Sequence, residues 1–184
     1  YDNRDSITSA KIKDGVVAAT TFRMFRNCSR LISVDLSGLD TSKVTEMGRE
    51  DTWESGMFSG CSRLAYLDLS SLDTSNVTSM GCMFEGCSSL TSLDLSTFDT
   101  SNVVDMNSMF AGCTKLTSLD LSGFDTSKVT NMGSKSSRTS AGMFEGCSSL
   151  ASLDLSSFDT SKVTDMSRMF CGCTKLTSLD LSRF

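Results

Sequence analysis

The chain has 184 residues, contains neither proline nor histidine, and carries a formal net charge of −5 at pH 7. This acidic balance lacks the basic stripe that nucleic-acid binding requires, so we expect no nucleic-acid partner. No apolar run approaches the roughly 18 residues of a membrane-spanning helix, and any signal peptide or anchor is expected to have been removed or to lie outside this sequence.

The chain repeats one unit, which is most easily recognised by its Met-Phe-x-x-Cys segment. Successive cysteines of this segment lie 26 residues apart, except for two intervals of 33 and 34 residues. Six copies of the segment begin at Met24, Met57, Met83, Met109, Met143 and Met169. Residues 7–28 carry only part of the pattern, with Ile7, Ala10 and Ile12 at the spacing of the later leucines. We interpret them as a degenerate first turn, as terminal repeats usually are.

After the cysteine, each unit continues with L-x-x-L-D-L-S, as in Leu90 to Ser96. The alternation over L-D-L predicts a half-buried strand with leucines on one side and aspartate on the other. The next segment, F-D-T-S-x-V-T-x-M, contains turn-forming residues, and its aspartate is expected to cap its own turn. The M-F-x-G-C segment is predicted to be a brief helical turn that ends at glycine.

A single unit cannot bury enough apolar surface to offset the entropy of ordering its backbone, so the units must stack. We therefore predict a single α/β domain over residues 1–184, with about seven right-handed turns. One parallel sheet of short strands would lie on one side, and turns and brief helices on the other. The chain stops within a unit and leaves an uncapped edge, which predicts a piece cut from a longer array.

Both longer units gain residues at one point, between the Met of V-T-x-M and the Met of M-F. The added segments are residues 48–56, GREDTWESG, and residues 133–142, GSKSSRTSAG. Such insertions are expected to form surface loops. Trp53 and Arg49 of the first insertion are hypothesised to form a protruding recognition loop, or Trp53 folds back over its own loop. Tyr66 replaces a serine of the strand face and, with Asp68, predicts a contact patch.

The eight cysteines divide into six at a fixed repeat position and two outside it. The six are predicted to form an inward column of small apolar groups. Cys82 and Cys171 stand where other units have polar residues, so we expect exposed thiols there. The sequence contains no C-x-x-C pair and no histidine, which makes a structural zinc site improbable, and no cofactor is expected.

Aspartates recur in two columns, one in the strand segment and one in the turn. The strand column is interpreted either as a solvated polar face or as a docking strip for a basic partner or cations. Asp68, Asp94 and Asp120 are its candidate contact residues. The strand column comprises Asp35, Asp68, Asp94, Asp120, Asp154 and Asp180, and the turn column Asp40, Asp73, Asp99, Asp125 and Asp159.

The combination of M-F-x-G-C-x-x-L-x-x-L-D-L-S with F-D-T-S-x-V-T-x-M resembles the BspA-like leucine-rich repeat surface proteins, in the variant found in Mycoplasma lipoproteins and gut Firmicutes. The resemblance covers about residues 24–184. It implies a curved leucine-rich-repeat solenoid on a secreted or anchored bacterial protein. In members with an assigned role, it implies adhesion to host matrix proteins such as fibronectin.

A non-catalytic binding module on the extracellular bacterial surface is the leading functional hypothesis. Without histidine, neither a Ser-His-Asp nor a Cys-His arrangement can form, and the carboxylates recur in every unit rather than marking one site. The alternative is a passive stalk that spaces a distal domain from the cell. Identical units would favour the stalk, whereas Trp53, Tyr66 and the insertions favour recognition of a protein partner.

Overall fold

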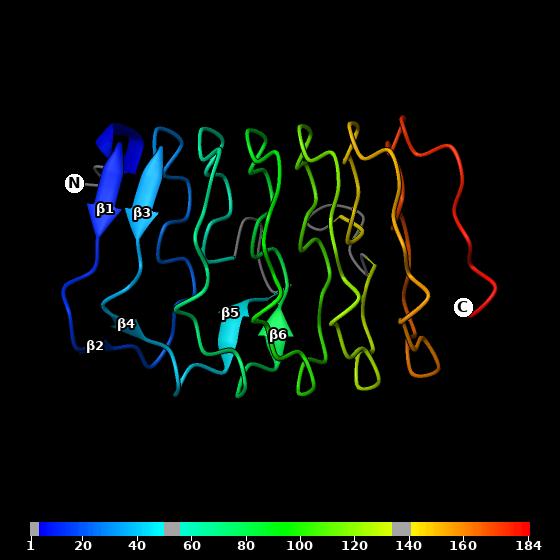
Figure 1. The fold of residues 1–184 in the computed structure, drawn as a ribbon, viewed down its shortest axis with the longest axis horizontal. Coiled ribbons are helices and arrows are strands. Elements are labelled where there is room, and N and C mark those ends of the chain that lie inside the picture. The colour runs from blue at the N-terminus through cyan, green and yellow to red at the C-terminus, as the bar shows by residue number, and fades with distance from the viewer. Residues whose placement is uncertain (1–3, 50–55, 134–140) are drawn as a thin grey trace.

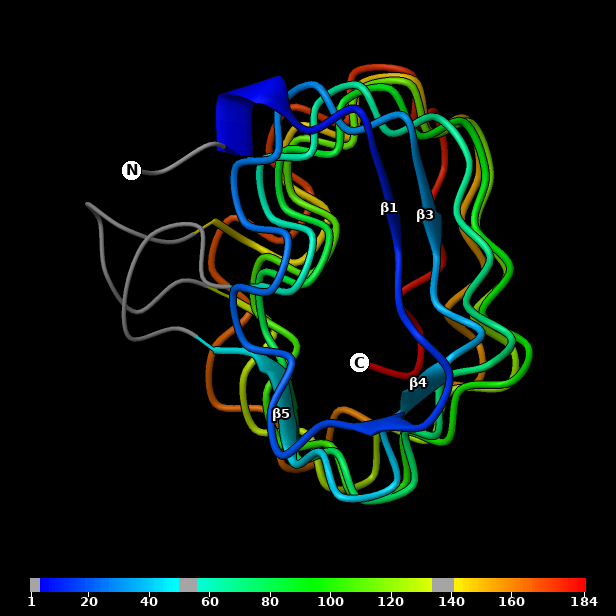
Figure 2. The ribbon, with the colours of Figure 1, turned by 90° about the vertical axis from the view of Figure 1, so that its left-hand side faces the viewer.

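The chain winds through successive coils that lie side by side, and one coil corresponds to one sequence unit. The computed structural model describes residues 4–49, 56–133 and 141–184. The coils follow one another along the long axis of the molecule, with the two termini at opposite ends (Figure 1). Viewed along that axis, they superimpose on one closed outline (Figure 2). The predicted repeat fold is therefore confirmed.

Short parallel strands join neighbouring coils, and a single turn of 3-10 helix, η1 (Arg4–Ser6), precedes them. Among the described residues, the strands form three separate two-stranded sheets rather than the one sheet we expected. The pairs are β1 (Ser9–Lys11) with β3 (Ser33–Asp35), β2 (Val16–Val17) with β4 (Leu39–Asp40), and β5 (Glu46–Gly48) with β6 (Ser79–Met80).

The longest parallel ladder runs through the V-T-x-M segments, not through the L-D-L segments. From Ser79 in β6, single parallel bridges continue to Asp105, Asn131 and Asp165. This ladder begins at β5, which lies across the outline from β1 and β3 (Figure 2). Of the repeated L-x-x-L-D-L-S segments within the described residues, the first one alone contains a regular strand, β3.

The backbone hydrogen bonds between coils explain why the ladder forms near the M-F segments and not along the L-D-L segments. On the M-F side they are short, as from Gly86 N–H to the Ala111 carbonyl at 2.7 Å. At the start of the L-D-L segment they lengthen to 3.3 Å between Thr117 N and Thr91 O, and to 3.4 Å between Ala151 N and Thr117 O. Since hydrogen bonds weaken with distance, the coils are held closely on the M-F side and more loosely on the L-D-L side.

The M-F-x-G-C segments are hydrogen-bonded turns, whereas we predicted brief helices. The Phe58 N–H donates to the Met83 carbonyl at 3.0 Å, and the Gly60 N–H donates to the Glu85 carbonyl at 2.7 Å. These donors therefore bond to the next coil and are not used for the i to i−4 bonds of an α-helix. From the second copy onward, each turn ends at a glycine of positive φ, such as Gly60 at 75°, and in the first copy Asn27 takes this place at 57°.

The core consists of columns in which each unit places the same residue type above its counterpart, as the sequence predicted. The rings of Phe58, Phe84, Phe110 and Phe144 are fully buried. Phenylalanines of successive coils stack nearly parallel, with ring centroids 5.5 to 6.0 Å apart. Leucines, valines and methionines of the repeat pack around this column.

The repeat cysteines form the predicted inward column. Those of the inner coils are buried, and Cys173 of the last coil is half-buried. From Cys61 onward, each of these thiols also donates to the carbonyl of a phenylalanine in the preceding coil, as Cys113 Sγ does to Phe84 O at 3.3 Å. Burial raises the pKa of Cys61 and of Cys147 to about 12, so these groups remain neutral thiols.

The two remaining cysteines differ from each other. Cys171 is exposed, as predicted, but Cys82 is buried, so that prediction was wrong. The Cys82 N–H donates to the Asn107 carbonyl of the next coil at 2.8 Å. On its other side, Gly56 approaches so closely that an added methyl group would lie 1.9 Å from the Cys82 carbonyl oxygen. The neighbouring coils therefore enclose this position from both directions.

Candidate functional site

The L-x-x-L-D-L-S segments of successive coils together form one surface, here called the L-D-L face. On it, each aspartate accepts a hydrogen bond from the serine two residues later. Asp68 Oδ1, for example, accepts from the Ser70 N–H at 3.0 Å and from the Ser70 hydroxyl at 2.7 Å. The same backbone bond joins Ser37 to Asp35, Ser96 to Asp94, Ser122 to Asp120, Ser156 to Asp154 and Ser182 to Asp180.

These caps keep the carboxylates ionised although like charges follow one another along the stack. The Ser70 hydroxyl, followed by the Ser70 N–H, lowers the pKa of Asp68 below its ordinary value, while the charges of Asp94 and Asp35 raise it in part. The pKa of Asp94 is lowered in the same way by Ser96. Stabilisation of the charged form by donors thus outweighs the repulsion between neighbouring carboxylates.

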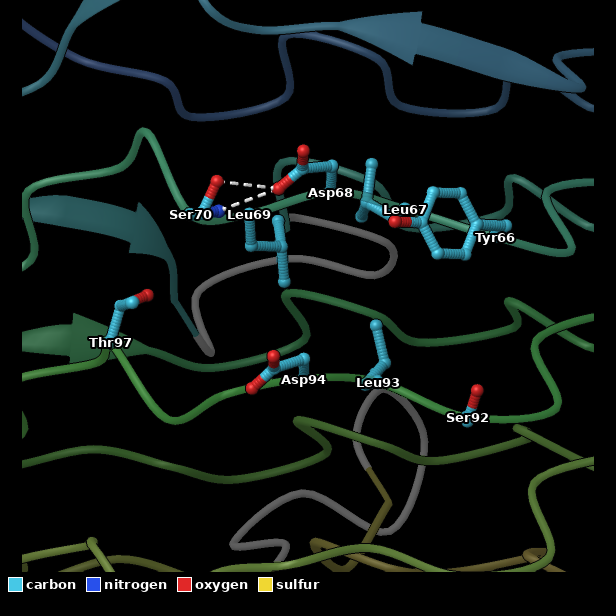
Figure 3. Close-up of a pocket in the computed structure, with 9 residues that line it drawn as sticks. All are labelled: Tyr66, Leu67, Asp68, Leu69, Ser70, Ser92, Leu93, Asp94 and Thr97. Carbon is cyan, nitrogen blue, oxygen red and sulfur yellow. Dashed lines mark hydrogen bonds between the residues drawn. The ribbon is translucent and has the colours of Figure 1, made fainter.

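Shallow hollows lie between neighbouring L-D-L segments, where the coils are held loosely. The one beside Tyr66 has a volume of about 250 Å³. Asp68 and Asp94 belong to its two neighbouring segments, and Tyr66 lies at one end of it (Figure 3). Buried leucines, Leu67 and Leu93 among them, supply apolar lining. Further hollows contain the pairs Asp35 and Asp68, Asp94 and Asp120, and Asp154 and Asp180.

The structure brings Tyr66, Asp68, Asp94 and Asp120 together on this face. The Tyr66 side chain is 73% exposed, at a position where other units have a small serine such as Ser92. An exposed aromatic side chain beside paired carboxylates is the kind of feature that interface contacts use.

Arg49 does not join this group. It follows β5, across the outline from β1 and β3 (Figure 2). Its guanidinium lies 5.0 Å from the centroid of the Phe22 ring and 3.4 Å from Glu46 Oε2. Trp53, predicted to accompany Arg49 in a recognition loop, lies outside the described residues, as does most of each insertion.

The turn aspartates cap their own turns. In the unit beginning at Phe98, Asp99 Oδ1 accepts from the Ser101 N–H at 2.9 Å. The serine caps of the strand column were not predicted from the sequence, from which we interpreted that column as a solvated face or a docking strip. The signal was available, because D-L-S has the same Asp-to-Ser spacing as D-T-S.

The threonine of D-T-S has a second role that the sequence analysis also missed. Thr100 is 2% exposed. Its hydroxyl donates to the Asp125 carbonyl at 3.0 Å and accepts from the Asp125 N–H at 2.8 Å. Thr41, Thr74 and Thr126 form the same pair of bonds with the next coil. The threonine hydroxyl therefore supplies the hydrogen-bond partner that the backbone N–H and carbonyl of the next coil would otherwise lack.

Within residues 4–49, 56–133 and 141–184, no cluster of three or more His, Cys, Asp or Glu side chains is placed to hold a metal ion. Over the same ranges, no helix combines the length and the hydrophobicity that a membrane-spanning segment requires.

Comparison with known proteins gives one sequence family and one solved structure. The family described as "Mycoplasma protein of unknown function, DUF285" matches residues 51–141 and 134–184. The crystal structure of the T. pallidum leucine-rich repeat protein is similar at 21% sequence identity and a TM-score of 0.47, over 92% of this chain and 78% of that chain. No curated protein matches the chain.

Proposed function

Because the chain belongs to the Mycoplasma protein family of unknown function DUF285, we propose that it is a non-catalytic, protein-binding module of a bacterial surface protein. The proposal includes an extracellular location and a BspA-like relationship. It also includes one leucine-rich-repeat solenoid domain over residues 1–184, with about seven right-handed turns. Its partners would be proteins, host matrix proteins such as fibronectin among them.

The L-D-L face is the observation that carries this proposal. Its hollows recur from coil to coil and combine a leucine lining with charged rims. Tyr66 places an exposed aromatic ring at a position where the other L-x-x-L-D-L-S segments have serine. Stacked-repeat proteins use continuous surfaces of this kind for recognition, and their specificity resides in the positions that differ between units.

A catalytic role is a poorer fit to the same residues. The carboxylates of the L-D-L face are held singly by serine caps, and their pKa values are lowered. A general acid would need a carboxyl with a raised pKa next to a partner of different protonation. The same serine-capped carboxylate recurs from coil to coil, and this repetition instead suits a partner that makes the same contact with successive coils.

The proposal can be tested with immobilised chain and a panel of purified host extracellular proteins that includes fibronectin. We expect saturable binding of at least one protein, weakened by Tyr66→Ser, which restores the serine of other units. Thr97→Ser, a smaller change at the rim of the same hollow, serves as the matched control. Thermal unfolding of each variant establishes that the fold is retained.

Failure of the whole panel to bind would contradict the proposal and favour the passive stalk. Binding that Tyr66→Ser leaves unchanged would retain a binding module but exclude Tyr66 from its contact. The Trp53→Ala variant then tests the first insertion, where the sequence places the other unusual aromatic residue.

A further inference from the structure

We propose that the hollows of the L-D-L face bind lysine side chains of an extended, basic segment of a partner protein. The hollow between Asp68 and Asp94 beside Tyr66 is the principal site. This inference rests on the proposed function and adds the chemistry of the partner.

The shape and polarity of the hollow match a lysine side chain. A lysine has an apolar stem and a single charged end, and it buries the stem while keeping the charge near water. In the hollow, Leu67, Leu69 and Leu93 are buried, whereas Asp68 and Asp94 are exposed. The stem would lie against the leucines, with the ammonium between carboxylates of neighbouring coils. Tyr66 could add a cation–π contact at one end.

Within the described residues, one lysine of the chain itself is bound to this row of aspartates. Lys11 of β1 is the register partner of Asp35 in β3, so the first coil has lysine at the position of the strand aspartate. Lys11 Nζ lies 2.9 Å from Asp35 Oδ2, while Asp35 Oδ1 accepts the bonds from Ser37. A serine cap and an ammonium group can therefore share one carboxylate of this row.

Most turn aspartates have a lysine of the protein beside them, and Asp73, on which the carboxylates of Asp40 and Asp99 act, is the exception. Lys43, for example, acts on Asp40, and Lys128 acts on Asp125. For Asp68, by contrast, the charges that act are the carboxylates of Asp94 and Asp35, which oppose the lowering of its pKa by Ser70. A bound cation would relieve this repulsion.

The partner is inferred to be an extended segment because the hollows follow one another along the stack. A segment that crosses the coils could place successive lysines in successive hollows. Each exposed ion pair contributes little alone, so affinity would come from several pairs that act together.

The probe for this inference is a synthetic peptide that alternates lysine with serine, titrated into the 184-residue chain. The double variant Asp68→Asn with Asp94→Asn is compared with Asp99→Asn with Asp125→Asn in the turn row. Both remove the same charge, and asparagine can still act as a cap. We expect about five- to tenfold weaker binding for the first variant, the product of two exposed ion pairs, and little change for the second. Added salt should weaken binding to the parent chain.

Equal losses in both variants would overturn the inference, because they would indicate attraction to net charge alone. So would an absence of peptide binding, or equal binding of the same peptide with every lysine acetylated. Unfolding curves check that both variants are folded. A host protein that binds the Asp68→Asn, Asp94→Asn variant as well as the parent would overturn this inference while the proposed binding module stands.

Discussion

At the residue scale, the buried threonines show how a side chain can complete the contact between two coils. The Thr100 hydroxyl is both donor and acceptor toward the backbone of Asp125, with bonds of 3.0 and 2.8 Å. A hydroxyl is the smallest group that satisfies a carbonyl and an N–H together. Because the site is closed to water, no solvent molecule can take the place of the hydroxyl without a cost in free energy.

We therefore predict that Thr100→Val destabilises the protein. Valine has nearly the same shape but leaves the Asp125 N–H and carbonyl without their partner, which costs about 1–3 kcal/mol. Urea unfolding monitored by circular dichroism measures the free energy of unfolding. Thr97→Val, an exposed site in the preceding segment, is the matched control and should change it by less than about 0.5 kcal/mol. Equal stability of the two variants would mean that the bonds to Asp125 contribute nothing net.

The same scale shows where residue-level prediction from sequence succeeds and fails. The turn caps could be predicted because an Asx cap depends on spacing alone, as between Asp99 and Ser101. The burial of Cys82 could not, because it depends on Gly56 and Asn107, which belong to the coils on either side. Alignment of units gives the position of a residue within its coil, but not what the neighbouring coils place over it.

At the element scale, the M-F-x-G turn determines how closely the coils approach. Gly86, Gly112 and Gly146 all have positive φ, and each turn glycine lies against the equivalent glycine of the neighbouring coil. A Cβ added to Gly112 would lie 3.4 Å from Gly86 Cα, a tight but tolerable contact. The requirement for glycine here is therefore chiefly one of backbone conformation.

We predict that Gly112→Ala lowers the free energy of unfolding by about 1–2 kcal/mol, since an L-residue is strained in the left-handed region. Gly123→Ala is the control, because a Cβ there would meet nothing within 4 Å. At a compatible site the loss of unfolded-state entropy makes alanine neutral or stabilising by about 0.4–1 kcal/mol. Chemical denaturation of the two single variants measures both effects. A Gly112→Ala variant as stable as the parent would contradict a conformational requirement.

Sequence patterns located the elements better than they predicted the hydrogen bonds of those elements. Alternation over L-D-L correctly places Leu93 and Leu95 inside and Asp94 outside. It cannot specify the separation between coils, on which a continuous ladder depends. That ladder formed instead at Ser79, Asp105 and Asn131, beside the closely held M-F turns. Periodicity in the sequence indicates which side of a segment is buried. The distance between neighbouring coils decides whether that segment becomes a regular strand.

At the scale of the whole molecule, identical residues stack in columns, so each coil contacts chiefly its two neighbours. Phe110 lies between Phe84 and Phe144, with centroid distances of 5.8 and 5.7 Å. Phe170 of the last coil stacks on Phe144 at 5.9 Å and is half-buried. Stability in such an array is a sum of unit and interface terms, so the position of a unit should govern the cost of a substitution.

We therefore predict that Phe110→Ala destabilises the protein by about 3–5 kcal/mol, the cost of a large cavity in a packed core. Phe170→Ala makes the same chemical change at the equivalent position, but its cost should be less than half as large. It removes contacts with one neighbour instead of two, and water can enter the space. Equilibrium unfolding gives both values, and hydrogen exchange should show that Phe170→Ala loosens the last coil while the central coils remain protected. Equal losses from both substitutions, with uniform loss of protection, would mean that the coils unfold as one cooperative body and not as a chain of neighbours.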